Sequence, residues 1–154
     1  MRIAIGADHG GVRLKARLVA WLTRRGYTAQ DLGAHTPAPC DYPRIGAAVA
    51  QRVAQRRADR GVLLCKSGIG IAIVANKIPG VRAANCRDVR DARLSREHND
   101  TNVLVLGATR LAAAQAQRIV ATWLKTPFHA RGRHARRVRQ ITALERRFSR
   151  RHHQ

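Results

Sequence analysis

The sequence is poor in aromatic residues and cysteines, and each shortage excludes a class of protein. Aromatic residues make up 4% of the 154 residues, which argues against a surface on which nucleic-acid bases stack. The three cysteines at positions 40, 65 and 86 are too few and too scattered for a disulfide framework or a zinc site. Reduced thiols and a cytoplasmic location are therefore expected. No apolar run is long enough to cross a membrane, and no signal peptide is expected because the first residues already follow a strand pattern.

Acidic residues are also scarce, and this raises the question of nucleic-acid binding. The chain has 9 Asp and Glu against 30 Lys and Arg, a net charge of +21. The arginines are spread along most of the predicted helices, and residues 129–154 carry less than half of the excess charge. We therefore expect no nucleic-acid partner beyond non-specific charge binding. The 45% of hydrophobic residues is enough for one folded domain.

Short apolar runs alternate with amphipathic segments along the chain. Strands are predicted at 2–7, 28–32, 61–65, 82–86 and 102–106, and helices at 12–25, 43–57, 70–77, 88–97, 111–124 and 133–147. This alternation predicts an α/β fold, a single-domain, doubly wound (Rossmann-like) five-stranded parallel sheet flanked by helices. The domain is expected to span 1–147, with Val138, Ile141 and Leu144 facing inward, and 148–154 to form a basic C-terminal tail.

The most informative segment is the end of the third strand, where Cys65 opens the turn Lys66-Ser67-Gly68-Ile69-Gly70 before a helix. Its glycines let backbone N–H groups converge, and the helix N-terminus adds a positive field, so a small anion pocket is predicted. A thiol in such a field loses its proton more easily and can act as a base or nucleophile. Taken alone, the segment fits a buried structural cysteine equally well. The turn lacks the Gly-Lys-Ser/Thr ending of a P-loop, so nucleotide binding is not supported.

Two other polar segments lie at predicted strand or helix ends. Asp8 and His9 follow the first strand, and His98 and Asn99 end the helix before the fifth. Ordinary helix capping explains each of these pairs as well as a site does. Arg133 and Arg137 are four residues apart and share one helix face, which suits either a phosphate grip or a solvated basic face.

Together the motifs resemble the type B ribose-5-phosphate isomerase family, which includes the galactose-6-phosphate isomerase subunits. They are Asp8-His9-Gly10-Gly11, Asp41-Tyr42-Pro43, Cys65-x-Ser67-Gly68-Ile69-Gly70, Ala75-Asn76-Lys77, the run from Ser95 to Asn102, and Gly132-Arg133-His134. The resemblance implies an intramolecular oxidoreductase of the pentose phosphate pathway, which interconverts ribose 5-phosphate and ribulose 5-phosphate through an enediolate without metal or cofactor. It also implies a homodimer with shared active sites, and tetramers occur in the family.

The resemblance further implies residue roles. Cys65 would be the base that moves the proton between C1 and C2, and His98 would open the sugar ring, helped by Asp8 or Ser67. The phosphate ligands would be His9, Arg110, Arg133 and Arg137. The backbone of Lys66, Ser67, Gly68, Ile69 and Gly70 would hold the enediolate oxygens, and Asn99 would contact the sugar. Such a reaction needs a base poised near neutral pH and donors aimed at the developing oxyanion.

The chain departs from the family pattern at three places. Lys66 stands where a small residue is frequent, and its ammonium would either favour the Cys65 thiolate or point to solvent. Ser67 replaces a common threonine, and the segment 107–110 is one residue longer than usual. Two alternatives stay open: an isomerase of a 6-phosphate sugar such as allose or galactose 6-phosphate, and a nucleic-acid-binding protein on an inactive scaffold. The second would have no need of Cys65, Ser67 and His98 together.

Overall fold

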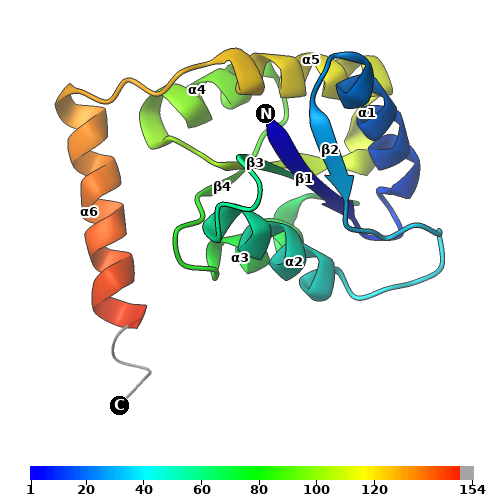
Figure 1. Ribbon diagram of the computed structural model, residues 1–154, viewed down its shortest axis with the longest axis horizontal. Helices are drawn as coiled ribbons and strands as arrows, with labels where there is room; N and C mark the ends of the chain where they lie inside the picture. The colour runs from blue at the N-terminus through cyan, green and yellow to red at the C-terminus, as the bar shows by residue number, and fades with distance from the viewer. Residues whose placement is uncertain (150–154) are drawn as a thin grey trace.

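The computed structural model describes residues 1–149 and has three layers, with helices on both sides of a sheet (Figure 1). The five strands are all parallel, in the order β2-β1-β3-β5-β4. They are β1 (Arg2–Ala7), β2 (Thr28–Asp31), β3 (Arg60–Cys65), β4 (Ala83–Asn85) and β5 (Val103–Gly107). The predicted α/β class and parallel sheet are confirmed. Within residues 1–149, no helix is both long and apolar enough to span a bilayer.

Two separate apolar cores attach the helices to the sheet. Helices α1 (Val12–Arg24), α4 (Val89–Asn99) and α5 (Ala113–Lys125) lie on one face, and α2 (Tyr42–Ala54) and α3 (Ile69–Asn76) on the other. Successive residues of β3 alternate between the cores: Leu64 packs in the first and Leu63 in the second. A strand covered on both faces must be apolar throughout, which explains the uninterrupted run before Cys65.

The last helix, α6 (Gly132–Ser149), stands apart from the three layers in Figure 1. It runs past the predicted boundary at 147/148, which therefore falls inside the helix, and the remainder of the predicted tail, 150–154, lies outside the described residues. The expected inward packing is wrong for Ile141 and Leu144, which are 44% and 56% exposed, whereas Val138 is half-buried. An amphipathic pattern indicates an apolar face, but not which surface covers it.

Candidate active site

The strand order reverses direction between β1 and β3, and in open α/β sheets this is where ligands bind. Ala7 pairs with Leu64 at the carboxyl ends of the two strands, and the Asp8 N–H donates to the Leu64 carbonyl at 3.1 Å. Asp8 after β1 and Cys65 at the end of β3 are thus brought to one edge of the sheet. Both are nearly buried, with 6% and 5% of their surfaces exposed.

Two backbone N–H groups of the Cys65 turn donate to side chains of the turn itself. The Gly68 N–H donates to the Cys65 Sγ at 3.0 Å, and the Ile69 N–H donates to the Ser67 Oγ at 3.2 Å as α3 begins. The N-terminal N–H groups of α3 face the same turn and favour negative charge there.

Neighbouring loops hold this turn in place. Gly68 has a left-handed φ of +79°, and an added Cβ would lie 2.6 Å from the Asn85 side chain, so only glycine fits there. The Asn85 amide donates to the Ser67 carbonyl at 3.2 Å. On the other side, the Thr109 hydroxyl donates to the Lys66 carbonyl at 2.8 Å. The turn therefore depends on residues from the ends of β4 and β5.

The loop after β1 lies against the same turn. The Gly10 N–H donates to the Asp8 carboxylate at 2.9 Å, and the Cys40 N–H donates to His9 Nδ1 at 3.3 Å. An ideal Cβ on Gly10 would lie 2.5 Å from Lys66 Cγ and 3.3 Å from Lys66 Cε. The Lys66 stem therefore lies across Gly10.

A groove of about 680 Å³ runs from this turn along the edge strand β4. Ser67, Ile69, Arg110 and Asn99 line it, so four predicted site residues share one groove. Cys86 also borders the groove, but burial raises the pKa of its thiol to about 11. Cys86 is therefore protonated at neutral pH and is not suited to act as a base.

The predicted residues His98, Arg133 and Arg137 lie together at the junction of α4 and α6. The His98 and His134 rings stack with centroids 4.0 Å apart and planes within 3°. Partial burial, followed by the nearby charges of His98, Arg133 and Arg137, lowers the pKa of His134. Arg133 and Arg137 are exposed on α6. This junction thus gathers a histidine pair and two guanidinium groups.

These two groups occupy opposite ends of the sheet. Cys65 pairs with Gly107 at the carboxyl end of β5, whereas α4 ends at Asn99, just before the first residue of β5, Val103. Four steps along a strand separate the two ends by roughly 13 Å. Within residues 1–149 of one chain, His98, Arg133 and Arg137 are therefore not gathered around Cys65.

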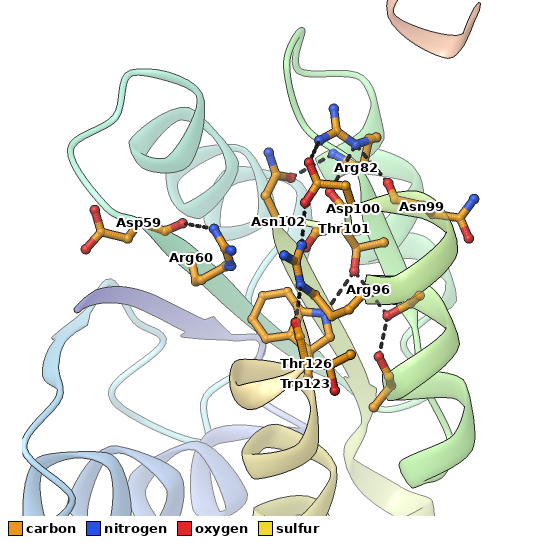
Figure 2. A network of polar contacts seen from close by, with 12 residues as sticks. Asp59, Arg60, Arg82, Arg96, Asn99, Asp100, Thr101, Asn102, Trp123 and Thr126 are labelled. Carbon is orange, nitrogen blue, oxygen red and sulfur yellow. Dashed lines mark hydrogen bonds and ion pairs between the residues drawn. The ribbon is translucent and has the colours of Figure 1, made fainter. Parts of the chain in front are cut away.

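A polar network fixes the segment that carries His98 and Asn99 (Figure 2). The Asp100 carboxylate accepts from Arg82 Nη2 at 2.9 Å and from Arg96 Nη1 at 2.7 Å. Arg96, only 4% exposed, also donates to the Thr101 carbonyl at 2.6 Å, and the Trp123 indole donates to the Thr101 hydroxyl at 2.9 Å. Asp100 itself adopts a left-handed φ of 46° and ends α4.

Sequence reasoning gave no role to several residues that shape the site. His134 stacks on His98, Asn85 and Thr109 hold the Cys65 turn, and the Tyr42 ring would meet a Cβ on Gly70 at 2.7 Å. The motif with His134 and the motif with Tyr42 were visible in the sequence, but their contacts were not. Within residues 1–149, no group of three or more His, Cys, Asp or Glu side chains is arranged to hold a metal ion.

A parallel α/β domain with a thiol and a glycine-rich turn of backbone N–H groups at its switch point is the architecture expected of a sugar-phosphate isomerase. Residues 3–141 match the Ribose/Galactose Isomerase family, and the chain belongs to that family. It is 44% identical to ribose-5-phosphate isomerase B of Escherichia coli over 95% of this chain and 97% of that one. It is also 36% identical to D-erythrulose-4-phosphate isomerase of Pectobacterium atrosepticum, over 86% and 88% of the two chains. The structure of ribose-5-phosphate isomerase B from Clostridium thermocellum superposes with a TM-score of 0.94 at 47% identity, covering 96% of this chain and 99% of that one.

Proposed function

We propose that the protein interconverts ribose 5-phosphate and ribulose 5-phosphate. The observation that carries the proposal is the Cys65 turn, where a nearly buried sulfur accepts a backbone N–H at the switch point of the sheet. The E. coli and C. thermocellum relatives are ribose-5-phosphate isomerases B, which supports the pentose phosphate as the substrate.

In the proposed reaction, the Cys65 thiolate takes the proton from C2 of the open-chain aldose. The electron pair left at C2 forms the C1–C2 double bond of an enediolate, and negative charge develops on O1. The backbone N–H groups from Lys66 to Gly70 stabilise that charge, and one such donor is typically worth roughly 10²–10³ in rate. Cys65 then returns its proton to C1, while a proton moves from O2 to O1 and leaves the ketose.

The ring-opening and phosphate-binding residues come, in this proposal, from a second copy of the chain. His98 would open the furanose ring, helped by Asp8 or Ser67 of the first copy, and Asn99 would contact the sugar. Arg133 and Arg137 of the second copy would bind the phosphate together with His9 and Arg110 of the first copy. The opposite positions of the two groups on one chain support a homodimer with shared active sites, as do the exposed Ile141 and Leu144 on α6.

Steady-state turnover of ribose 5-phosphate by the purified protein tests the proposal, with Cys65→Ala as the variant. Wild-type activity that falls by at least about 10³-fold in Cys65→Ala is expected, because loss of the base removes proton transfer. Cys86→Ala is the matched control, since it removes a buried thiol that stays protonated, and it is expected to keep most of the activity.

The substrate assignment is tested beside this reaction with allose 6-phosphate and erythrulose 4-phosphate. A higher kcat/KM on either of these sugars would replace the pentose as the substrate but keep the isomerase chemistry. Full activity of Cys65→Ala would remove Cys65 as the base.

A further inference from the structure

The charge of α6 is divided unevenly around the helix. Arg136 and Arg139 are three residues apart, Ala143 follows Arg139 after four, and Arg146 and Arg147 follow Ala143 after three and four. The four arginines therefore share one face of the helix. We name these four residues the arginine stripe. All four are exposed, and Arg139, Arg146 and Arg147 line a shallow groove of about 590 Å³.

The rest of α6 is used differently. His134 stacks on His98, and the Glu145 carboxylate accepts the Gly80 N–H at 2.9 Å, so this side faces the domain. Glu145 is the single acidic residue of α6, and its contact turns it away from the stripe. Within residues 1–149, none of the four stripe arginines forms an ion pair.

Some other arginines of the domain form ion pairs. Arg2 pairs with Asp59 at 2.9 Å, and Arg82 and Arg96 share Asp100. Within residues 1–149, the arginine stripe has no carboxylate partner, and its charges repel one another along the helix. A row of uncompensated guanidinium groups is complementary to a polyanion with regularly spaced phosphates.

We propose that the arginine stripe binds the phosphate backbone of double-stranded nucleic acid without sequence preference. From Arg136 to Arg147 the stripe extends roughly 16 Å along the helix axis, a length over which a duplex presents roughly ten phosphate charges. A duplex fits better than a single strand, because single-strand binding relies on aromatic side chains on which the bases stack. The single Phe, Tyr or Trp of α6 is Phe148, and the Arg147 guanidinium lies 5.8 Å from its ring centroid. The stripe is separate from Arg133 and Arg137, so binding here is compatible with isomerase turnover.

The test is fluorescence anisotropy of a labelled 20-base-pair DNA duplex of arbitrary sequence, titrated with the full-length protein from 50 to 300 mM salt. The stripe variant replaces Arg136, Arg139, Arg146 and Arg147 with Gln. Its slope of log affinity against log salt is expected to be shallower than wild type by about 3 to 4, because each phosphate contact contributes about 0.9.

A matched control replaces the exposed Arg17, Arg24, Arg90 and Arg93 with Gln, which removes the same charge from α1 and α4. This control is expected to lower the slope by less than about 1.

A third variant, with the four stripe arginines changed to Lys, keeps the charge and is expected to bind almost as wild type. All three variants are expected to isomerise ribose 5-phosphate at the wild-type rate if the proposed function holds; the binding result stands independently of that activity. Equal loss of binding in the stripe and control variants would overturn the proposal, as would absence of wild-type binding at 150 mM salt. Stripe-dependent capture on anionic phosphatidylserine vesicles without duplex binding would also overturn it, in favour of a membrane surface.

Discussion

At the scale of single residues, Lys66 links the Cys65 turn to the loop after β1. Its stem lies over Gly10, where an added Cβ would come within 2.5 Å of Lys66 Cγ and 3.3 Å of the Asp8 carboxylate. The φ of Gly10 is not in the left-handed region, so its backbone tolerates alanine. Gly10 is therefore constrained by its neighbours and not by its own conformation. The pair Gly10 and Lys66 couples the loop after β1 to the Cys65 turn.

Gly10→Ala is expected to lower kcat/KM for ribose 5-phosphate by about 10-fold, because the new methyl group must displace Lys66 or the Asp8 loop. Adding Lys66→Gly removes the clash, so the double variant should recover most of what the alanine costs. Steady-state kinetics of the two single variants and the double variant give this coupling, which is expected at about 1 kcal/mol. Strictly additive effects would show that the Lys66 stem does not occupy the space above Gly10.

At the scale of elements, the sequence pattern predicts what depends on local periodicity. The bounds of β1 agree fully with prediction, and α1 differs by one residue at its C-terminus. Arg82, expected in the fourth strand, instead lies just before β4 and uses its guanidinium on Asp100. The position of α6 was not predictable in the same way, because its apolar residues show amphipathicity without specifying the surface that covers them.

The same distinction applies to the candidate site. The Cys65 turn follows from a continuous stretch of chain, so its glycines and thiol were recognisable. The His98–His134 stack joins residues 36 positions apart in the sequence. The bond from Trp123 to Thr101 spans 22 positions. Contacts of this kind depend on how α4, α5 and α6 pack, which no local pattern records.

The network around Asp100 predicts the effect of one substitution at the end of α4. Asp100→Asn keeps the shape and the tolerance for a left-handed φ, but removes the charge shared by Arg82 and the buried Arg96. The free energy of unfolding, measured by urea denaturation, is expected to fall by about 1–3 kcal/mol. Because His98 lies two residues away, kcat for ribose 5-phosphate should fall as well.

Asp59→Asn is the matched control for Asp100→Asn. It breaks a more exposed ion pair with Arg2, distant in the sequence from His98, and is expected to cost under about 1 kcal/mol. Its kcat should stay at the wild-type value. Similar stability and kcat for both variants would mean that the Asp100 network does not position the end of α4.

At the scale of the whole molecule, the separation of the two residue groups makes one chain insufficient for the proposed reaction. In the proposed homodimer, a second copy related by twofold symmetry would supply to each site what the first lacks, and each chain would contribute to both sites. Complementation between inactive subunits tests this arrangement directly. Cys65→Ala and His98→Ala are each expected to be inactive alone. In a mixed dimer of the two variants, one site combines an intact Cys65 with an intact His98. The other site combines the two altered residues.

Random mixing of the two variants by co-expression is therefore expected to restore about a quarter of the wild-type activity, since half of the dimers are mixed and each has one intact site. The control mixes Cys65→Ala with Asp8→Ala. These residues lie at the carboxyl ends of adjacent strands of the same chain, so every site in the mixed dimer lacks one of them. Activity above that of either variant alone is the expected result for the first mixture, and no such gain is expected for the second. Recovery in neither mixture, with mixed dimers verified by differential tags, would mean that one chain supplies every catalytic residue.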